Sequence, residues 1–107
     1  MADEILVVLT TWPDIEKARS AARKLVEEKC AACANLVPGI ESIYRWQGQV
    51  ETSAEVLVIF KTTIAHYQMF ESRVCELHGY EVPEILALRV SDGLQSYLRW
   101  VEESCRD

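Results

Sequence analysis

Four side chains have the residue types and the spacing of a zinc site. Cys30 and Cys33 are two residues apart, and so are Cys75 and His78. Sets of three cysteines and one histidine bind Zn²⁺ with Zn–S bonds of about 2.3 Å. The first pair is expected to follow the first helix and the second pair to end an antiparallel second helix. A helix of ~16 residues is ~24 Å long, so the two pairs lie too far apart. All four cysteines are interpreted as buried or half-buried apolar side chains.

A second group of polar residues is expected at one edge of a sheet. Its members end the first strand or follow the second helix, and they are Thr10, Thr11, His78, Tyr80, Glu81 and Glu84. Imidazole with carboxylates suits copper, zinc or nickel, so His78 and Glu84 are predicted metal ligands. The alternative is that His78 only sits favourably at a helix C-terminus and that the glutamates are solvated.

Cys33 and Lys61 lie on neighbouring strands of a predicted hairpin. They are expected to line a cleft between subunits, which Trp46 and Tyr80 would complete. Cys33 is also a third candidate metal ligand, because thiolates bind soft divalent ions. The alternative for Cys33 is a position in the core.

No pattern typical of an enzyme is present. The sequence has two histidines, His66 and His78, and neither belongs to a recognisable Ser-His-Asp or Cys-His arrangement. Glycine-rich phosphate-binding loops are absent from the sequence as well. We therefore expect a binding protein and not an enzyme.

Composition and charge restrict the class of partner. The chain has 107 residues, which predicts one domain over residues 1–107. Eleven Lys and Arg residues face seventeen Asp and Glu residues, for a net charge of −6. No basic cluster is present, so a nucleic acid or an anionic membrane surface is not an expected partner.

The apolar runs and the N-terminus predict a cytosolic protein. Apolar runs such as Ile5–Leu9 and Val56–Phe60 are far shorter than the ~20 residues of a membrane span. The first four residues, Met-Ala-Asp-Glu, lack the basic start of a signal peptide. Thiols are reduced in the cytosol, so no disulfide is expected.

The periodicity of apolar residues predicts three helices and four strands. A strand over 5–9 precedes a helix that starts at Thr11–Asp14 and ends near Glu28. Residues 32–62 form one long hairpin, with a bulge at Pro38-Gly39 and a turn at 47–49. A second helix follows the caps Thr62 and Thr63 and ends at Gly79. A strand over 84–90 and a third helix after 91–93 complete the chain.

This order, β-α-β-β-α-β followed by α, predicts an α+β fold of the ferredoxin-like class. Right-handed crossovers give an antiparallel sheet with both long helices on one face. The other face is open, yet Val56–Phe60 is apolar on both faces of its strand. Self-association is the simplest explanation, and Val58→Asp is expected to destabilise the assembly. The alternative is that the third helix folds back over part of this face.

Three blocks of the sequence resemble the CutA divalent-cation-tolerance family. They are 31–48 (AACANLVPGIESIYRWQG), 61–63 (KTT) and 78–85 (HGYEVPEI). The similarity runs from about Ile5 to Trp100, with the blocks in the order of the family. The resemblance implies a ferredoxin-like subunit, a homotrimer packed around a three-fold axis, and a likeness to the nitrogen-regulatory P-II proteins. It also implies an association with copper and other divalent cations.

Two departures from the family pattern bear on metal binding. The usual His-Pro-Tyr is His78-Gly79-Tyr80 in this sequence. Copper ligation in the family involves a cysteine that ends the first strand and a histidine pair that closes the second helix. The matching residues are Thr10, Leu77 and His78, so one of three copper-type ligands is retained.

The sequence therefore predicts a cytosolic homotrimer that binds divalent cations such as copper or zinc and contributes to metal tolerance. The alternative is a P-II-like regulatory trimer that binds a small metabolite in the clefts between subunits and signals to a partner protein. A stable scaffold without a small ligand is the third hypothesis.

Overall fold

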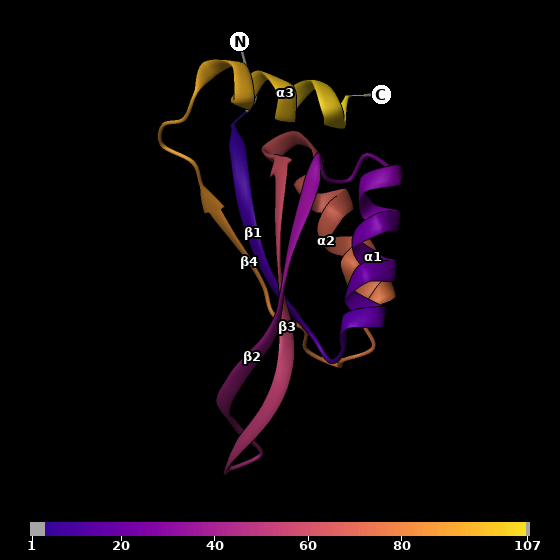
Figure 1. Cartoon of the computed structure of the whole chain (residues 1–107), viewed down its shortest axis with the longest axis vertical. Coiled ribbons are helices and arrows are strands. Elements are labelled where there is room, and N and C mark those ends of the chain that lie inside the picture. Colours follow the sequence, from indigo (N-terminus) through magenta and orange to yellow (C-terminus); the bar gives the residue numbers. More distant parts are fainter. Residues whose placement is uncertain (1–3, 107) are drawn as a thin grey trace.

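The computed structural model describes residues 4–106, which form an α+β domain (Figure 1). The strands are β1 (Ile5–Trp12), β2 (Cys33–Trp46), β3 (Gln49–Thr63) and β4 (Ile85–Arg89). The helices are α1 (Ile15–Glu27), the short 3-10 turn η1 (Ile64–His66), α2 (Tyr67–Leu77) and α3 (Gln95–Cys105).

The four strands form one antiparallel sheet in the order β2-β3-β1-β4. Helices α1 and α2 lie together on one face of this sheet, and α3 lies across the end where β1 begins (Figure 1). Two crossovers on the same face, each through a helix, place β1 and β3 in the centre. The predicted ferredoxin-like topology is confirmed.

Side chains of the central strands point alternately to the two faces of the sheet, and those on the helix side form the core. In β1 the core residues are Leu6, Val8 and Trp12, and in β3 they are Val56, Val58 and Phe60. Small residues of α1 allow a close approach to the sheet, and Phe70 of α2 packs edge-to-face on Phe60 with ring centroids 5.0 Å apart.

The start of α1 differs from the prediction. Strand β1 does not stop at Leu9 but continues to Trp12. The side chains of Thr10 and Trp12 are fully buried in this extended part of the strand. The hydroxyl of Thr10 donates to the carbonyl of Val58 (3.0 Å) and accepts from the Trp12 indole N–H (2.7 Å). The N-cap is therefore Asp14, whose carboxylate accepts from the Lys17 amide at 2.8 Å, and not Thr11.

The hairpin of β2 and β3 extends beyond the rest of the domain and accounts for its longest dimension, 47 Å (Figure 1). Its register shifts between Val37 and Ile40, as Pro38-Gly39 predicted. Gln47 (φ +50°) and Gly48 (φ +79°) form the turn in left-handed conformations, which match the twist of a two-residue hairpin.

The helix-free face of the sheet is apolar. Leu57 and Ile59 of β3 alternate with core residues and are half-buried, and Leu86 and Leu88 of β4 are 55% and 53% exposed. The prediction that placed Val58 on this face is wrong: it is fully buried under the helices, because side chains alternate along a strand. Helix α3 covers only the sheet end, where Val101 and Cys105 pack on Ile5 and Ala32.

Candidate functional site

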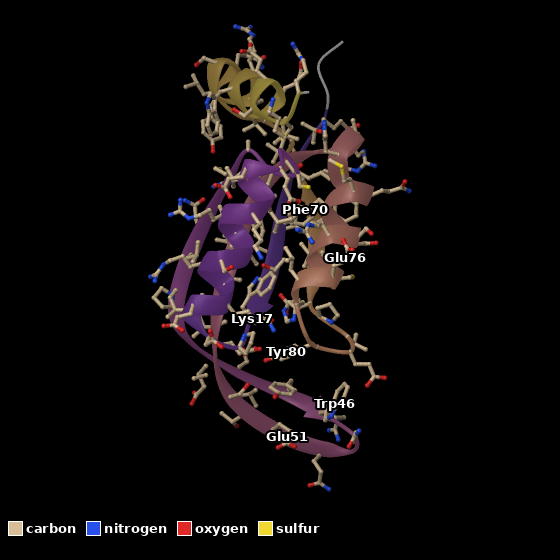
Figure 2. The ribbon with its side chains drawn as sticks, turned by 90° about the vertical axis from the view of Figure 1, so that its right-hand side faces the viewer. Lys17, Trp46, Glu51, Phe70, Glu76 and Tyr80 are labelled. Carbon is tan, nitrogen blue, oxygen red and sulfur yellow. The ribbon has the colours of Figure 1, made fainter. Side chains whose placement is uncertain are left out.

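A cavity of about 680 Å³ lies where the hairpin leaves the domain. One wall is the hairpin, and the other is the segment that joins α2 to β4, with the end of β1 between them. The lining residues are Thr11, Ser42, Ile43, Tyr44, Trp46, Glu51, Glu55, Gly79, Tyr80, Glu81, Val82 and Glu84. Figure 2 shows Tyr80 between the helical part of the domain and the hairpin strands that carry Trp46 and Glu51. We call this cavity the hairpin pocket.

A hydrogen bond ties the two walls of the hairpin pocket together. The phenol of Tyr80 donates to Oε2 of Glu55 at 3.1 Å. Glu55 is only 8% exposed although it carries a carboxylate. Burial, and next the bond to Glu55, raises the pKa of the Tyr80 phenol above its usual value of 10. Tyr80 therefore remains a protonated donor at neutral pH.

Aromatic and acidic side chains lie on the same face of the hairpin wall. Tyr44 pairs in register with Glu51, so the two side chains share one face of the hairpin. Tyr44 and Trp46 are 43% and 45% exposed, which leaves ring surface available to a ligand. The Tyr44 hydroxyl also lies 3.4 Å from that of Ser53.

Four carboxylates line the hairpin pocket, and no lysine or arginine is among the described residues that line it. Glu51 and Glu55 come from the hairpin, and Glu81 and Glu84 from the segment before β4. A concave surface with low-dielectric walls and charges of one sign concentrates the electrostatic potential, so the pocket favours cations.

His78, the first predicted metal ligand, lies behind the pocket wall and is fully buried. Its Nε2–H donates to the Thr11 carbonyl at 2.5 Å, and its Nδ1 accepts from the Tyr80 amide at 3.4 Å. The ring also stacks on Trp12, with centroids 4.3 Å apart. Both nitrogens are therefore used within the chain, and this arrangement does not fit a metal ion at His78.

The other predicted residues divide between two ends of the sheet. Trp46, Tyr80 and Glu84 line the hairpin pocket together, although Trp46 was predicted in the cleft with Cys33 and Lys61, and Glu84 in the metal site with His78. Cys33 and Lys61 pair with each other near the start of β2, where the Cys33 thiol lies 3.7 Å from the Tyr97 hydroxyl. The Lys61 ammonium donates to the Asn35 side chain there. One chain therefore does not form the predicted four-residue cleft.

Metal-ligating side chains do not converge within residues 4–106. No group of three or more His, Cys, Asp or Glu residues in this part of the chain is placed to hold a metal ion. Cys30 and Cys105 are buried, Cys33 is half-buried, Cys75 is exposed, and none of the four forms a disulfide within the described residues. The described helices also include none that is long and apolar enough to cross a bilayer.

The site residues that the sequence did not predict include Tyr44, Glu51 and Glu55. A signal was present, because positions 51, 53 and 55 share one face of a strand and Glu55 directly precedes an apolar run. A carboxylate at such a position either points into solvent or lines a pocket. The path of the segment after α2 decides between these two possibilities, and it cannot be predicted from the strand alone.

Comparison with known proteins places the chain in a family. Residues 6–104 match the family described as CutA1 divalent ion tolerance protein. The chain belongs to the CutA1 family. A divalent-cation tolerance protein CutA of Thermus thermophilus is 50% identical over 98 residues, which cover 92% of this chain and 95% of the relative. A chloroplastic CutA of Arabidopsis thaliana is 41% identical, and the match covers 95% of this chain but 56% of that longer protein.

Solved CutA1 structures share the fold over nearly the whole chain. The Thermus thermophilus protein superposes with a TM-score of 0.92 at 49% identity, covering 94% of this chain and 97% of the other. CutA1 from Oryza sativa superposes with a TM-score of 0.95 at 40% identity, covering 99% and 97%. The family resemblance predicted from the three sequence blocks is confirmed, and the CutA1 family is named for divalent-cation tolerance and not for an enzymatic reaction.

Proposed function

We propose that this chain acts in divalent-cation tolerance as a homotrimer, assembled through the helix-free face of its sheet. The observation that supports this assembly is the apolar character of the helix-free face. Leu57, Ile59, Leu86 and Leu88 lie on it, and the two β4 leucines are more than half exposed. An apolar sheet face of this kind on an acidic domain is typical of a protein interface.

The hydrophobic effect is large enough to drive this assembly. Burial of apolar surface contributes about 25 cal/mol per Å². An interface of ordinary size, about 800 Å² per partner, therefore has a gross driving force above roughly 10 kcal/mol before the costs of association.

Sedimentation equilibrium tests the assembly. We expect a mass three times the 12.2 kDa of one chain. A folded monomer at micromolar concentration would contradict the proposal, and a dimer would contradict its three-fold form.

The cation role rests on carboxylates in this proposal and not on His78. Glu84 is exposed and lines the hairpin pocket, as Glu81 does. Carboxylate oxygens contact divalent cations without the loss of a buried hydrogen bond, whereas His78 would lose two. We expect Glu84 to bind Cu²⁺ or Zn²⁺ weakly, with further ligands from a neighbouring subunit. This agrees with the observation that the described residues of one chain include no group of three potential metal ligands.

Calorimetric titration with Cu²⁺ and Zn²⁺ tests this role. Glu84→Gln is expected to weaken cation binding several-fold, and Glu103→Gln on α3 is the matched control for loss of one charge. Equal heats in both variants and in the wild type would remove Glu84 from the site.

The hairpin pocket favours a second candidate function, a P-II-like regulator that binds a small molecule. A cavity of 680 Å³ is within the range of about 300–1,000 Å³ that is usual for small-molecule sites. Thermal-shift screening of metabolites against metals separates the two functions, because a metabolite-induced shift in the absence of metal favours the regulator. The cytosolic location stays a prediction of the sequence.

A further inference from the structure

We infer that the two ends of the helix-free face meet between subunits: the α3 end of one copy docks against the hairpin pocket of the next copy. The residues that we call the α3 end are Cys33, Lys61, Tyr97, Arg99 and Trp100. The docking rests on the proposed trimer, and it names which surface of one copy contacts which surface of the next.

The α3 end and the hairpin pocket lie at opposite ends of the sheet (Figure 1). Lys61 pairs with Cys33 near the start of β2. Glu51 pairs with Tyr44 near the hairpin turn. Because side chains alternate along a strand, Lys61 and Glu51 share the helix-free face with Ile59. Ten residues of β3 at about 3.3 Å each separate Lys61 from Glu51, so these positions are roughly 33 Å apart within one chain. Only two different copies can bring them together.

Helix α3 adds exposed aromatic side chains to its end of the helix-free face. The Tyr97 hydroxyl lies 3.7 Å from the Cys33 thiol. The Trp100 ring lies beside that of Tyr97, with centroids 5.6 Å apart. Tyr97 and Trp100 are 41% and 46% exposed, whereas Val101, which holds α3 on the domain, is fully buried. The exposed aromatic side chains of α3 therefore extend the apolar surface of the helix-free face.

The two ends carry opposite charges. Four carboxylates and no lysine or arginine are among the described residues that line the hairpin pocket. The α3 end has Lys61 and Arg99, and neither forms an ion pair within residues 4–106. Glu55 of the pocket forms none there either, although it is only 8% exposed. Opposite charges favour the docking of two surfaces and fix its register. We therefore expect Lys61 of one subunit to pair with Glu51 or Glu55 of the next.

Three-fold symmetry requires two different surfaces on each copy. A two-fold contact joins a surface to itself, whereas a ring of three joins one surface of each copy to a second surface of the next copy. An acidic and a basic surface at opposite ends of one face allow three copies to close such a ring head to tail. The same docking assembles the predicted cleft from two subunits. Cys33 and Lys61 come from one subunit, and Trp46 and Tyr80 come from the next.

Charge reversal followed by analytical ultracentrifugation tests the docking on the intact chain. Glu51→Lys with Glu81→Lys reverses charges of the pocket, and Lys61→Glu with Arg99→Glu reverses those of the α3 end. Each pair of substitutions places like charges together, so it should raise the concentration at which half of the trimer dissociates at least tenfold. All four substitutions in one chain restore opposite charges, and we expect that concentration to return to within about threefold of the wild-type value.

A control variant and a cross-linking measurement complete the test. Glu16→Lys with Glu27→Lys reverses two charges on the exposed side of α1 and is expected to leave trimer dissociation unchanged. Glu51→Cys in a Cys75→Ser background is treated with a bismaleimide much shorter than the ~33 Å between positions 33 and 51 of one chain. Such a reagent joins Cys33 to position 51 only between subunits, so covalent dimers and trimers are expected on a denaturing gel. Cys33→Ser should abolish them.

The outcomes distinguish failure of the docking from failure of the trimer. A wild-type trimer without rescue in the fourfold variant would overturn the docking and leave the trimer in place, and so would a trimer without Cys33-dependent cross-links. A folded wild-type monomer would overturn both. Circular dichroism identifies any charge-reversed variant that does not fold, and the cross-linking result then decides.

Discussion

The imidazole of His78 stacks on the indole of Trp12 with ring centroids 4.3 Å apart, and both side chains are fully buried. This contact joins the end of α2 to the end of β1. The two ring nitrogens of His78 also bind the Thr11 carbonyl and the Tyr80 amide. Because the ring is stacked and both nitrogens are bonded within the chain, His78 has a structural role.

Replacement of His78 by alanine is expected to lower the free energy of unfolding by about 2–4 kcal/mol, because a buried ring and two hydrogen bonds are lost. Urea denaturation measures this change. His66→Ala is the control, since His66 is half-buried and bonds Thr63 locally, and about 1 kcal/mol is expected for it. Loss of Cu²⁺ binding in a His78→Ala variant of wild-type stability would contradict the structural role.

Charges at Leu57 and Val58 are expected to have different effects although the two residues are adjacent. Leu57→Asp places a carboxylate on the helix-free face and should give folded chains of lower mass. Val58→Asp places it in the core and should unfold the subunit, because a buried unpaired charge costs several kcal/mol. Circular dichroism and sedimentation distinguish the two results. A folded monomer from Val58→Asp would contradict the orientation of β3.

Stability in acid is expected to depend on the ion pair between the end of α1 and α2. Two hydrogen bonds from Arg73, 2.8 and 2.9 Å long, lower the pKa of Glu28 below its usual 4.5. A carboxyl group with a lowered folded pKa stabilises the fold above its unfolded pKa, and this contribution is lost as the pH falls through the folded pKa. Arg73→Gln should therefore return the pKa of Glu28 toward 4.5, as measured by NMR titration of its carboxyl carbon. The variant should also flatten the pH dependence of stability below pH 4.5. Both groups are exposed to solvent, so added salt should reduce the difference.

Gly79 occupies a backbone conformation that proline, the residue that the family resemblance implies at this position, does not adopt. Its φ is +94°, whereas proline is restricted to about −65°. Gly79→Ala is expected to cost about 1 kcal/mol or more of unfolding free energy, and Gly79→Pro more than that.

A double variant separates the two causes of this cost. An alanine Cβ would lie 2.6 Å from the Lys17 ammonium, so Lys17→Ala with Gly79→Ala removes the contact but keeps the strained φ. We expect most of the loss to persist in the double variant. Full recovery of stability would show that the contact, and not φ, restricts position 79.

The sequence alone determined the topology, the order of the elements and the apolar second face of the sheet. These follow from local rules: the alternation of apolar residues in strands, their three-to-four spacing in helices, and the conformations that Gly39, Gly48 and Gly79 allow. It also predicted a cleft that includes Trp46 and Tyr80 and a metal site that includes Glu84, but not that the three residues line one pocket.

The tertiary structure alone decided which face of each strand is buried and which side chains meet. Val58 and Leu57 are both apolar, so only the packing of α1 and α2 shows that the first is core. His78 has the residue type of a ligand, but Trp12, Thr11 and Tyr80 occupy its ring and both nitrogens. Glu55 and Tyr80 are 25 residues apart, and their contact depends on the path of the segment after α2. Such long-range pairings carry no short-range sequence signal, because they depend on the relative placement of whole elements.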